Sequence, residues 1–158
     1  MPESFTSRMY RWGFNLFPAY RGTGGRVLYI ANDWREVKIK LPLNWRTRNY
    51  VGTIFGGSIY GAIDPFYMLM LMQILGPGYT VWDKAANIRF RRPGKSMLFA
   101  DFHLEDKEIE EIKRLAAAEH SIDRVYNVEL KDRKGVVHAR IEKTLYISEK
   151  TDSKEKGV

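Results

Sequence analysis

The feature that most constrains the fold is a nearly uncharged run at residues 53–75, TIFGGSIYGAIDPFYMLMLMQIL. Its one charged residue, Asp64, is followed directly by Pro65. The run can be a membrane span, a buried helix in which Asp64 only shapes the backbone, or a buried helix in which Asp64 does chemistry. The neighbouring sequence bears on the choice between these three interpretations.

The membrane interpretation fails on length and charge. A transmembrane helix needs roughly 20 predominantly apolar residues, but Gly56, Gly57, Gly61 and Asp64 interrupt the first half of the run and leave only residues 65–75 continuous. An aspartate at mid-bilayer would also cost about 2.5–3.5 kcal/mol. We therefore predict a helix buried at the centre of a soluble fold, and no membrane partner.

The composition fits one cytoplasmic domain. A chain of 158 residues with 44% hydrophobic residues can build a single core. We predict one domain over residues 1–148 and a polar, disordered tail over residues 149–158. There is no cysteine, which excludes disulfides and thiolate chemistry. The first residues, MPESFTSRMYRWGF, lack the apolar core of a signal peptide.

Alternating hydrophobicity predicts strands on both sides of the central helix. Residues 25–33 and 35–43 form a predicted hairpin, in which Val37, Ile39 and Leu41 alternate with lysines. Residues 80–94 and 96–106 form two more strands around a turn at Pro93 and Gly94, with Ile88 and Phe90 predicted to face inward. Two final strands lie within residues 123–147, on either side of a turn at 132–135.

A short amphipathic helix completes the predicted order. Residues 107–119 carry apolar side chains at helical spacing, and Asp106 is a candidate N-cap. The order is therefore two strands, a central helix, two strands, a short helix and two strands. An antiparallel sheet wrapped around its one strongly hydrophobic helix, an α+β fold, satisfies this order.

The positive charge is concentrated in two segments. Residues 1–50 hold nine Lys or Arg against three Asp or Glu, and residues 84–95 hold five basic residues and no acid. An anionic partner is therefore plausible. No zinc-finger spacing, RNP-type aromatic motif or helix-turn-helix pattern is evident, so we predict no nucleic-acid partner.

The approach to the helix resembles a known signature. Asn49, Gly52, Gly56-Gly57, six residues and then Asp64 resemble the Asn-x-x-Gly-x-x-His-Gly-Gly-(six)-Asp pattern of hotdog-fold thioesterases of the phenylacetate-pathway (PaaI) type. NYVGTIFGGSIYGAIDPFYMLML is more similar still to an uncharacterised bacterial hotdog family described as tetrameric acyl-CoA thioesterases. The resemblance covers most of residues 14–147. It implies a hotdog fold, an acyl-CoA substrate and a homodimer or homotetramer.

One position departs from that pattern. Phe55 stands where the family has a histidine, so the function of that imidazole is absent here or is supplied by another group. The departure leaves the predicted fold intact and puts the activity in question.

The two glycines suit a carbonyl-binding site. Backbone N–H groups at a helix N-terminus are unsatisfied, and the absence of side chains lets a ligand carbonyl approach closely. Gly57, with Gly56 beside it, is thus a candidate oxyanion donor for thioester hydrolysis. The alternative is that both glycines merely turn the chain into the helix.

Asp64 is a candidate nucleophile or general base, but it lies too far from Gly57 to act on the same carbonyl. Seven residues of helix correspond to about 10.5 Å. Two central helices packed antiparallel across a two-fold axis would bring Asp64 of one subunit near Gly57 of the other. In the alternative interpretation, Asp64 is the N-cap and Pro65 the first residue of a second helical segment, 65–75.

The remaining candidates are substrate contacts. Asn49 can contact the thioester or fix the loop before the helix. Asp83 can help to hold the attacking water, or it can be a strand-end residue. Arg89, Arg91 and Arg92 suit the phosphates of coenzyme A, although a solvated strand face is the commoner explanation for any single one of them.

The predicted function is therefore hydrolysis of an acyl-CoA thioester, in which Gly57 binds the oxyanion and the partner subunit's Asp64 acts as base or nucleophile. The alternative is a protein that binds acyl groups or acyl-CoA without turnover. We expect no cofactor beyond the coenzyme A of the substrate. The histidines have no metal-ligand spacing, so we expect no metal.

Overall fold

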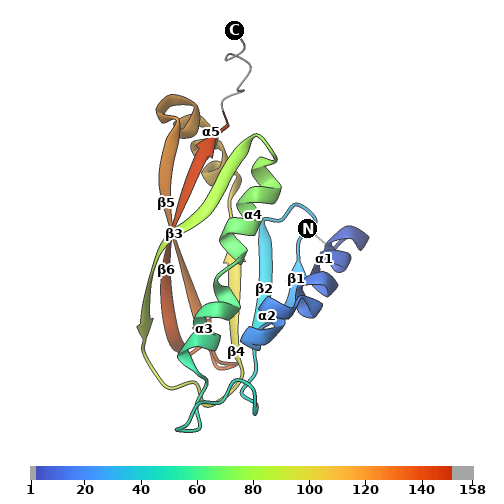
Figure 1. The fold of residues 1–158 in the computed structure, drawn as a ribbon, viewed down its shortest axis with the longest axis vertical. Helices are drawn as coiled ribbons and strands as arrows, with labels where there is room; N and C mark the ends of the chain where they lie inside the picture. Colours follow the sequence, from blue (N-terminus) through green and yellow to red (C-terminus); the bar gives the residue numbers. More distant parts are fainter. Residues whose placement is uncertain (1–2, 151–158) are drawn as a thin grey trace.

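The computed structural model describes residues 3–150, which form one α+β unit (Figure 1). Its strands are β1 (Arg26–Ile30), β2 (Glu36–Leu41), β3 (Tyr79–Phe90), β4 (Leu98–His103), β5 (Ser121–Lys131) and β6 (Val137–Glu149). Its helices are α1 (Phe5–Leu16), α2 (Pro18–Thr23), α3 (Gly56–Ile63), α4 (Phe66–Leu75) and α5 (Asp106–Glu119).

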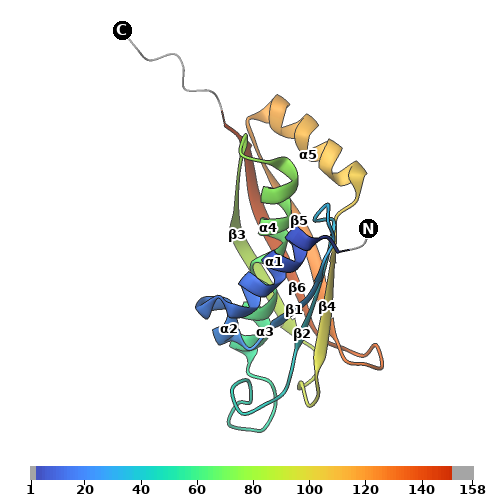
Figure 2. The ribbon, with the colours of Figure 1, turned by 90° about the vertical axis from the view of Figure 1, so that its right-hand side faces the viewer.

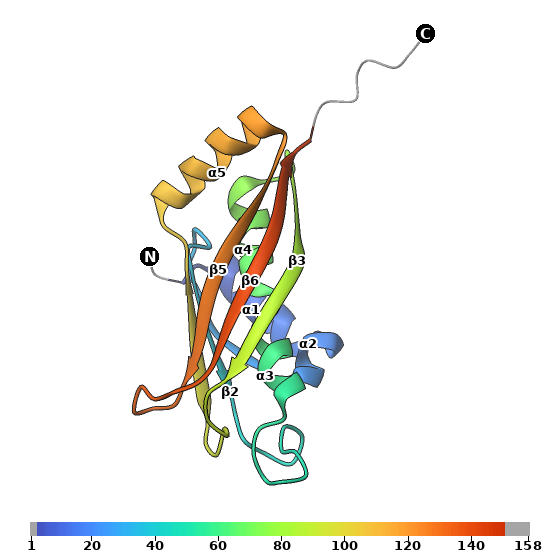
Figure 3. The ribbon, with the colours of Figure 1, turned by 90° about the vertical axis from the view of Figure 1, so that its left-hand side faces the viewer.

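The strands form a six-stranded antiparallel sheet in the order β1-β2-β4-β5-β6-β3. The predicted hairpin of β1 and β2 is confirmed, and so is the turn between β5 and β6. The sheet curves around α3 and α4 (Figures 1 and 3). This arrangement leaves β3 as a long edge strand whose second side pairs with no strand of residues 3–150.

The central helices supply the core, as predicted. Phe66, Met70 and Leu71 are fully buried, and the Phe66 ring lies 5.1 Å from that of Phe102 on β4. The helical stretch Gly56–Leu75 has the length and apolar character of a membrane span. Here its apolar side chains pack against a sheet, which is the environment predicted for residues 53–75.

The junction between α3 and α4 differs from the N-cap prediction. Asp64 has helical angles (φ −49°, ψ −48°), and its N–H donates to Tyr60 O (2.9 Å). Its carboxylate accepts no hydrogen bond from a backbone N–H of α4, so Asp64 is not the N-cap of that helix. Pro65 is also helical, and its carbonyl accepts from Leu69 N (3.0 Å). The helix thus continues through the proline, and the Asp64 carboxylate is free to contact another part of the fold.

Two other local predictions are wrong. The N-cap residue of α5 is Glu105, while Asp106 is the first helical residue and forms an ion pair with Arg35. Phe90 is 58% exposed and does not face the core. In addition, the segment at Pro93 and Gly94 joins two strands that do not pair with each other, because β3 lies at the sheet edge and β4 lies inside the sheet.

Helices α1 and α2 were not predicted. They lie on the side of the central helices away from β3, with α1 against β1 and α2 against α3 (Figure 2). At the other terminus, β6 reaches Glu149, and Lys150 N donates to Gly78 O (2.8 Å). The rest of the predicted tail lies outside the described residues.

Candidate functional site

A cavity of about 470 Å³ opens at the N-terminal end of α3. Four of the predicted site residues, Asn49, Gly56, Arg91 and Arg92, line it. The other lining residues are Thr53, Ile54, Ile59, Phe90, Pro93 and Gly94. Residues far apart in the sequence therefore meet where the resemblance placed a thioester site.

Asn49 organises the loop that leads into this cavity. Its side-chain oxygen accepts from Val51 N (3.1 Å) and Thr53 N (3.0 Å), and its Nδ2 donates to Thr53 Oγ1 (2.9 Å). Gly52 has φ +83°, a conformation that glycine adopts without strain. The geometry supports the loop-fixing role of Asn49, which brings the chain into α3 at a defined angle.

The first turn of α3 presents unsatisfied donors. Phe55 N donates to Thr47 O (2.7 Å), and Phe55 O accepts from Ile59 N (3.1 Å). Within residues 3–150, the backbone N–H groups of Gly56, Gly57 and Ser58 make no hydrogen bond. The positive end of the helix dipole thus carries three unpaired donors, and of these three residues only Gly56 lines the cavity.

Aromatic rings lie directly on the two glycines. A Cβ atom on Gly57 would stand 2.4 Å from Cε1 of Phe55, and a Cβ on Gly56 would stand 3.1 Å from Cζ of Phe90. The side chains of Phe55 and Phe90 are 57% and 58% exposed. The rings thus partly cover the helix terminus, and because they are exposed they can move without disturbing the core.

The carboxylate of Asp64 contacts a buried lysine. Lys143 Nζ donates to Asp64 Oδ1 (2.6 Å) and to the Asp64 carbonyl oxygen (2.6 Å), and it lies 2.7 Å from Asp83 Oδ1. The Lys143 side chain has 0% exposure, whereas those of Asp64 and Asp83 are 40% and 25% exposed. One ammonium group thus joins a helix carboxylate to a strand carboxylate.

The charges of this cluster do not balance. Burial raises the pKa of Asp83 above its ordinary value, and the Lys143 ammonium opposes that rise. Burial, together with the adjacent Asp64 carboxylate, raises the pKa of Tyr60, whose ring lies 5.6 Å from Lys143 Nζ. Asp83 Oδ1 is buried without a well-directed hydrogen bond in the described part of the chain. Two carboxylates therefore share one cation, with Asp64 the more exposed of the two.

Within one chain, the acidic cluster and the cavity are separate. Asp64 and Asp83 are not among the residues that line the cavity. Asp83 is also seven strand residues from Phe90, a separation of about 23 Å at ~3.3 Å per residue. Asp64 and Asp83 are therefore brought together by the fold, but the fold of one chain does not bring them to Gly57.

The three predicted arginines divide between two surfaces. Arg91 and Arg92 line the cavity, and the backbone N–H groups of both residues donate to His138 O (2.8 and 3.1 Å). Arg89 lines a smaller hollow of about 280 Å³ with Arg91, Arg140, Asn87, Asn127 and Glu142. Only Arg91 lines both hollows, so an anionic ligand in the cavity would meet Arg91 and Arg92 first.

Lys143 is the site residue that the sequence analysis missed. The alternation of β6 places its side chain on the same face as Ala139, Ile141, Leu145 and Ile147, all of which are buried. A lysine on the buried face of a strand requires a counter-charge. The lysine at a core-facing position of β6 could have been noticed in the sequence, and Asp64, the one acidic residue in the central helix, was a candidate for its counter-charge.

The described residues include no group of three or more His, Asp or Glu side chains placed to hold a metal ion.

Comparisons with known proteins agree with this architecture. A sequence model of the family described as "Domain of unknown function (DUF4442)" matches residues 6–147. The search of curated proteins found no relative with significant sequence similarity.

Several solved structures share the hotdog fold. A Pseudomonas aeruginosa protein of unknown function, described as a probable thioesterase, is 18% identical with a TM-score of 0.79, over 95% of this chain and 99% of that one. A Haemophilus influenzae thioesterase is 15% identical with a TM-score of 0.68, over 97% of each chain. A Chlorobaculum tepidum protein of unknown function is 13% identical with a TM-score of 0.72, over 92% of this chain and 95% of that one. The predicted hotdog fold is confirmed.

Proposed function

The chain belongs to the DUF4442 family and has the hotdog fold, and on this basis we propose that it hydrolyses acyl thioesters of the acyl-CoA type. The observation that carries the proposal is the pairing of an unsatisfied helix N-terminus beside a cavity with a solvent-accessible carboxylate in the same central helix. The thioesterase descriptions of two structural relatives support the same reaction class.

In the proposed reaction the thioester carbonyl lies at the first turn of α3. The N–H of Gly57 donates to the carbonyl oxygen, and the helix dipole stabilises the negative charge that develops there. Asp64 accepts a proton from water as the water oxygen bonds to the carbonyl carbon, or it attacks that carbon itself. In the first route the carbon–sulfur bond then breaks, and the thiolate takes the proton that Asp64 accepted, which leaves a carboxylic acid and a thiol. In the second route breakage of the carbon–sulfur bond releases the thiolate and leaves a mixed anhydride on Asp64, and water then hydrolyses this anhydride to the carboxylic acid and restores Asp64.

The site requires two subunits in this proposal. Gly57 and Asp64 are about 10.5 Å apart along one helix, so the carboxylate comes from a second copy packed antiparallel. The unpaired edge of β3 supports such an assembly, because Lys84, Ala85, Ala86 and Asn87 on it are all exposed. Two copies joined along β3 would place their central helices on the same side of a continuous sheet.

Lys143 would act on Asp64 in this site. Its ammonium group donates to the carboxylate from the buried side and so fixes the position of that carboxylate at the surface of the central helix. The exposed side of Asp64 stays open to water. Arg91 and Arg92 at the cavity suit the phosphate groups of the carrier.

The test is thioester hydrolysis by the purified protein, followed as thiol release from acyl-CoAs of short, long and aromatic acyl groups. Asp64→Asn should lower kcat at least about 100-fold, the usual contribution of a general base. Asp106→Asn is the matched control, because that carboxylate is 75% exposed and pairs with Arg35 at the start of α5, away from the residues that line the cavity and from β3. An Asp64→Asn variant that turns over as fast as wild type would remove the mechanism.

A second function, acyl-CoA binding without turnover, is favoured by one observation. The Phe55 ring lies against Gly57, with Cε1 only 2.4 Å from where a Cβ atom on that glycine would stand, and so it covers part of the helix terminus. In that case acyl-CoA would raise the melting temperature of the protein while no thiol is released from any member of the panel. Phe55→Ala uncovers the glycine, and release of thiol by that variant alone would identify the ring as the block.

A further inference from the structure

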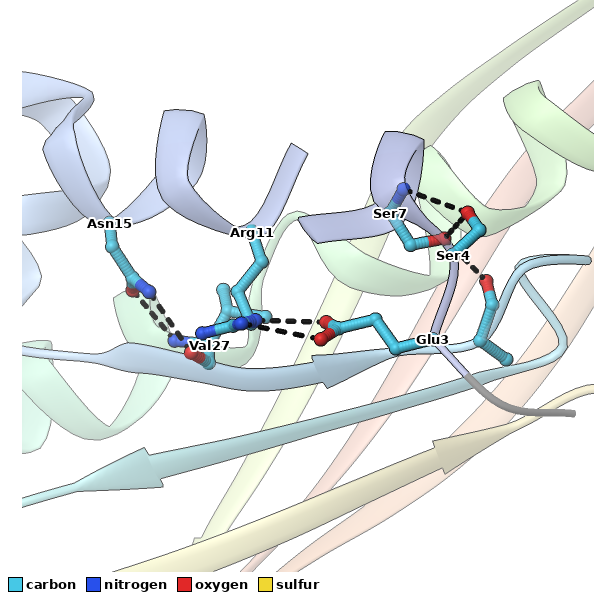
Figure 4. A network of polar contacts seen from close by, with 7 residues as sticks. Glu3, Ser4, Ser7, Arg11, Asn15 and Val27 are labelled. Atoms are coloured by element: carbon cyan, nitrogen blue, oxygen red, sulfur yellow. Dashed lines mark hydrogen bonds and ion pairs between the residues drawn. The ribbon is translucent and has the colours of Figure 1, made fainter. Parts of the chain in front are cut away.

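Helix α1 is amphipathic in the reverse of the usual sense, because its polar side faces the protein. Ser7 is 2% exposed, and its hydroxyl donates to Ala31 O (3.4 Å). Asn15 donates to Val27 O (3.0 Å) and accepts from Val27 N (2.8 Å). Figure 4 shows these side chains directed from α1 toward β1. The polar side of α1 therefore satisfies the edge of the sheet.

An ion pair completes this inner side. Arg11 Nε and Nη2 donate to the two carboxylate oxygens of Glu3 (2.8 and 3.2 Å), between the contacts of Ser7 and Asn15 (Figure 4). Phe14 and Tyr10 add apolar contact, since both rings pack edge-on against Trp34. The orientation of α1 is thus set by polar and aromatic contacts on one side of the helix.

The opposite side is an exposed apolar surface. It consists of Phe5 (70% exposed), Met9 (60%), Trp12 (62%), Leu16 (63%) and Phe17 (58%), which we call the outer stripe. Its first four members are spaced four, three and four residues apart, so they lie along one face of the helix. A hollow of about 630 Å³, lined by Met9 and Phe17 together with Thr6, Tyr10, Gly13 and Phe14, runs beside it.

The outer stripe is larger than scattered surface hydrophobics. A fully buried aromatic side chain covers about 150–250 Å², so five large side chains, each more than half exposed, present several hundred Å² of contiguous apolar area. Patches of that size mark protein or membrane interaction sites. The outer stripe therefore indicates a partner.

The charge around the stripe is positive. Residues 3–32 contain Arg8, Arg11, Arg21 and Arg26 but only one acid, Glu3, which Arg11 neutralises. Arg8 is exposed within the stripe, where its guanidinium lies 5.9 Å from the Phe5 ring centroid. Arg21 is exposed on α2. A partner that covers the stripe meets uncompensated arginines at its border.

A second copy of the chain fits this surface less well than a lipid surface. Twelve residues of helix span about 18 Å, and two such helices in contact reach only the low end of the areas that stable interfaces bury. A two-fold contact would also bring the Arg8 side chains of both copies to one border. In an anionic bilayer, by contrast, the acyl chains can bury all five apolar side chains, and the anionic headgroups complement the charge of the arginines.

We propose that α1 docks on the surface of an anionic membrane, with the outer stripe at the boundary between headgroups and acyl chains. Arg8 and Arg21 then contact lipid phosphates, and Trp12 lies at the depth where tryptophan is enriched in membrane proteins. The expectation of no membrane partner was based on residues 53–75 not crossing a bilayer, and α1 requires no crossing.

Flotation of the full chain with phosphatidylcholine vesicles, with or without one quarter phosphatidylglycerol, tests the proposal. The protein should float with the anionic vesicles and at least tenfold less with the neutral ones, and added salt should weaken its binding. Met9→Ser combined with Trp12→Ser should reduce binding to anionic vesicles at least tenfold. Arg8→Gln should also reduce binding to anionic vesicles, but it should leave the weak binding to neutral vesicles unchanged.

Trp45→Ser is the matched control, because Trp45 is 78% exposed in the loop before α3, away from the outer stripe. It should bind as wild type does, and all variants should keep the wild-type melting temperature, since each changed side chain points outward. Absence of wild-type binding, or binding that survives loss of Met9 and Trp12, would overturn the proposal. So would an oligomer in sedimentation experiments that the double variant dissociates, because the stripe would then be a contact between copies.

Discussion

Three ionisable side chains, Asp64, Asp83 and Lys143, meet at one buried contact between the central helix and the sheet. The aspartate before Pro65 has the sequence context of a helix cap. In the structure its carboxylate binds a lysine that lies 79 residues away in the sequence. The cost of a helical conformation before proline is thus offset by contacts that Lys143 makes with both the carbonyl and the carboxylate of Asp64.

Lys143→Met should be strongly destabilising. The substitution leaves two partly exposed carboxylates without their buried cation. Removing one partner of a fully buried ion pair costs about 3–5 kcal/mol, and because solvent reaches both carboxylates we expect a cost at the lower end of that range. Urea denaturation gives the free energy of unfolding directly. Lys38→Met is the control, since Lys38 is exposed and its pair with Glu36 should contribute less than about 1 kcal/mol.

The same cluster can be tested by removing its negative charges. In an Asp64→Asn, Asp83→Asn background, Lys143→Met should cost much less than in wild type, because no carboxylate is left unpaired. An equal cost in both backgrounds would assign the effect of Lys143 to packing.

At the scale of elements, the turn between β5 and β6 is fastened to the segment that lines the cavity. Asp132 accepts from Lys134 N (2.9 Å) and Val136 N (3.0 Å). Its other oxygen lies 3.3 Å from His138 Nε2, and His138 Nδ1 lies 3.0 Å from Pro93 O. Hydrogen bonds therefore connect the turn, the first residues of β6 and the cavity wall at Pro93.

Asp132→Asn should lower the melting temperature in a pH-dependent way. The Val136 N–H, and then His138 and Lys134, hold the pKa of Asp132 below its ordinary value of 3.8. A lowered folded-state pKa stabilises the protein above pH 3.8, and this contribution is lost as the pH falls through the folded-state pKa. The difference in melting temperature between wild type and variant should therefore be largest near neutral pH and vanish in strong acid. A difference that persists unchanged in acid would contradict this origin.

At the scale of the whole molecule, the proposed mechanism predicts a site shared between two subunits, because Gly57 and Asp64 are too far apart in one chain to act on the same carbonyl. Neither Asp64→Asn nor Gly57→Val alone should hydrolyse thioesters, since the first lacks the carboxylate and the side chain of the second would meet the Phe55 ring and crowd the first turn of α3. A mixed dimer of the two variants has one intact site, formed by Gly57 of the first variant and Asp64 of the second. Random reassembly of equal amounts should restore about a quarter of wild-type activity.

Activity measured after co-refolding, against each variant refolded alone, checks this expectation. If mixing restores nothing although size-exclusion chromatography shows mixed dimers, the two groups do not act on the same carbonyl.

Period-two alternation predicted the six strands, and the apolar run predicted the core helix, because both patterns report which side chains must leave water. Local pattern was misleading where long-range contacts compete with it. Asp64 is not the N-cap of a second helix, since its carboxylate binds Lys143. Phe90 faces outward, since strand β3 ends at the sheet edge and its ring lies on Gly56. Helix α1 was missed because its apolar side is the exposed one, the reverse of the usual pattern.

The sequence by itself determined the element order, the α+β class and the start of the central helix, since hydrophobic period and glycine placement act over a few neighbouring positions. The hotdog fold was implied by the resemblance of the segment from Asn49 to Asp64 to a known family. Only the tertiary structure decided what each polar face meets. Asp64 contacts Lys143, and the polar side of α1 contacts β1. These pairings depend on which segments the sheet brings together, and the free energy of a buried charge depends on partners that no local pattern contains.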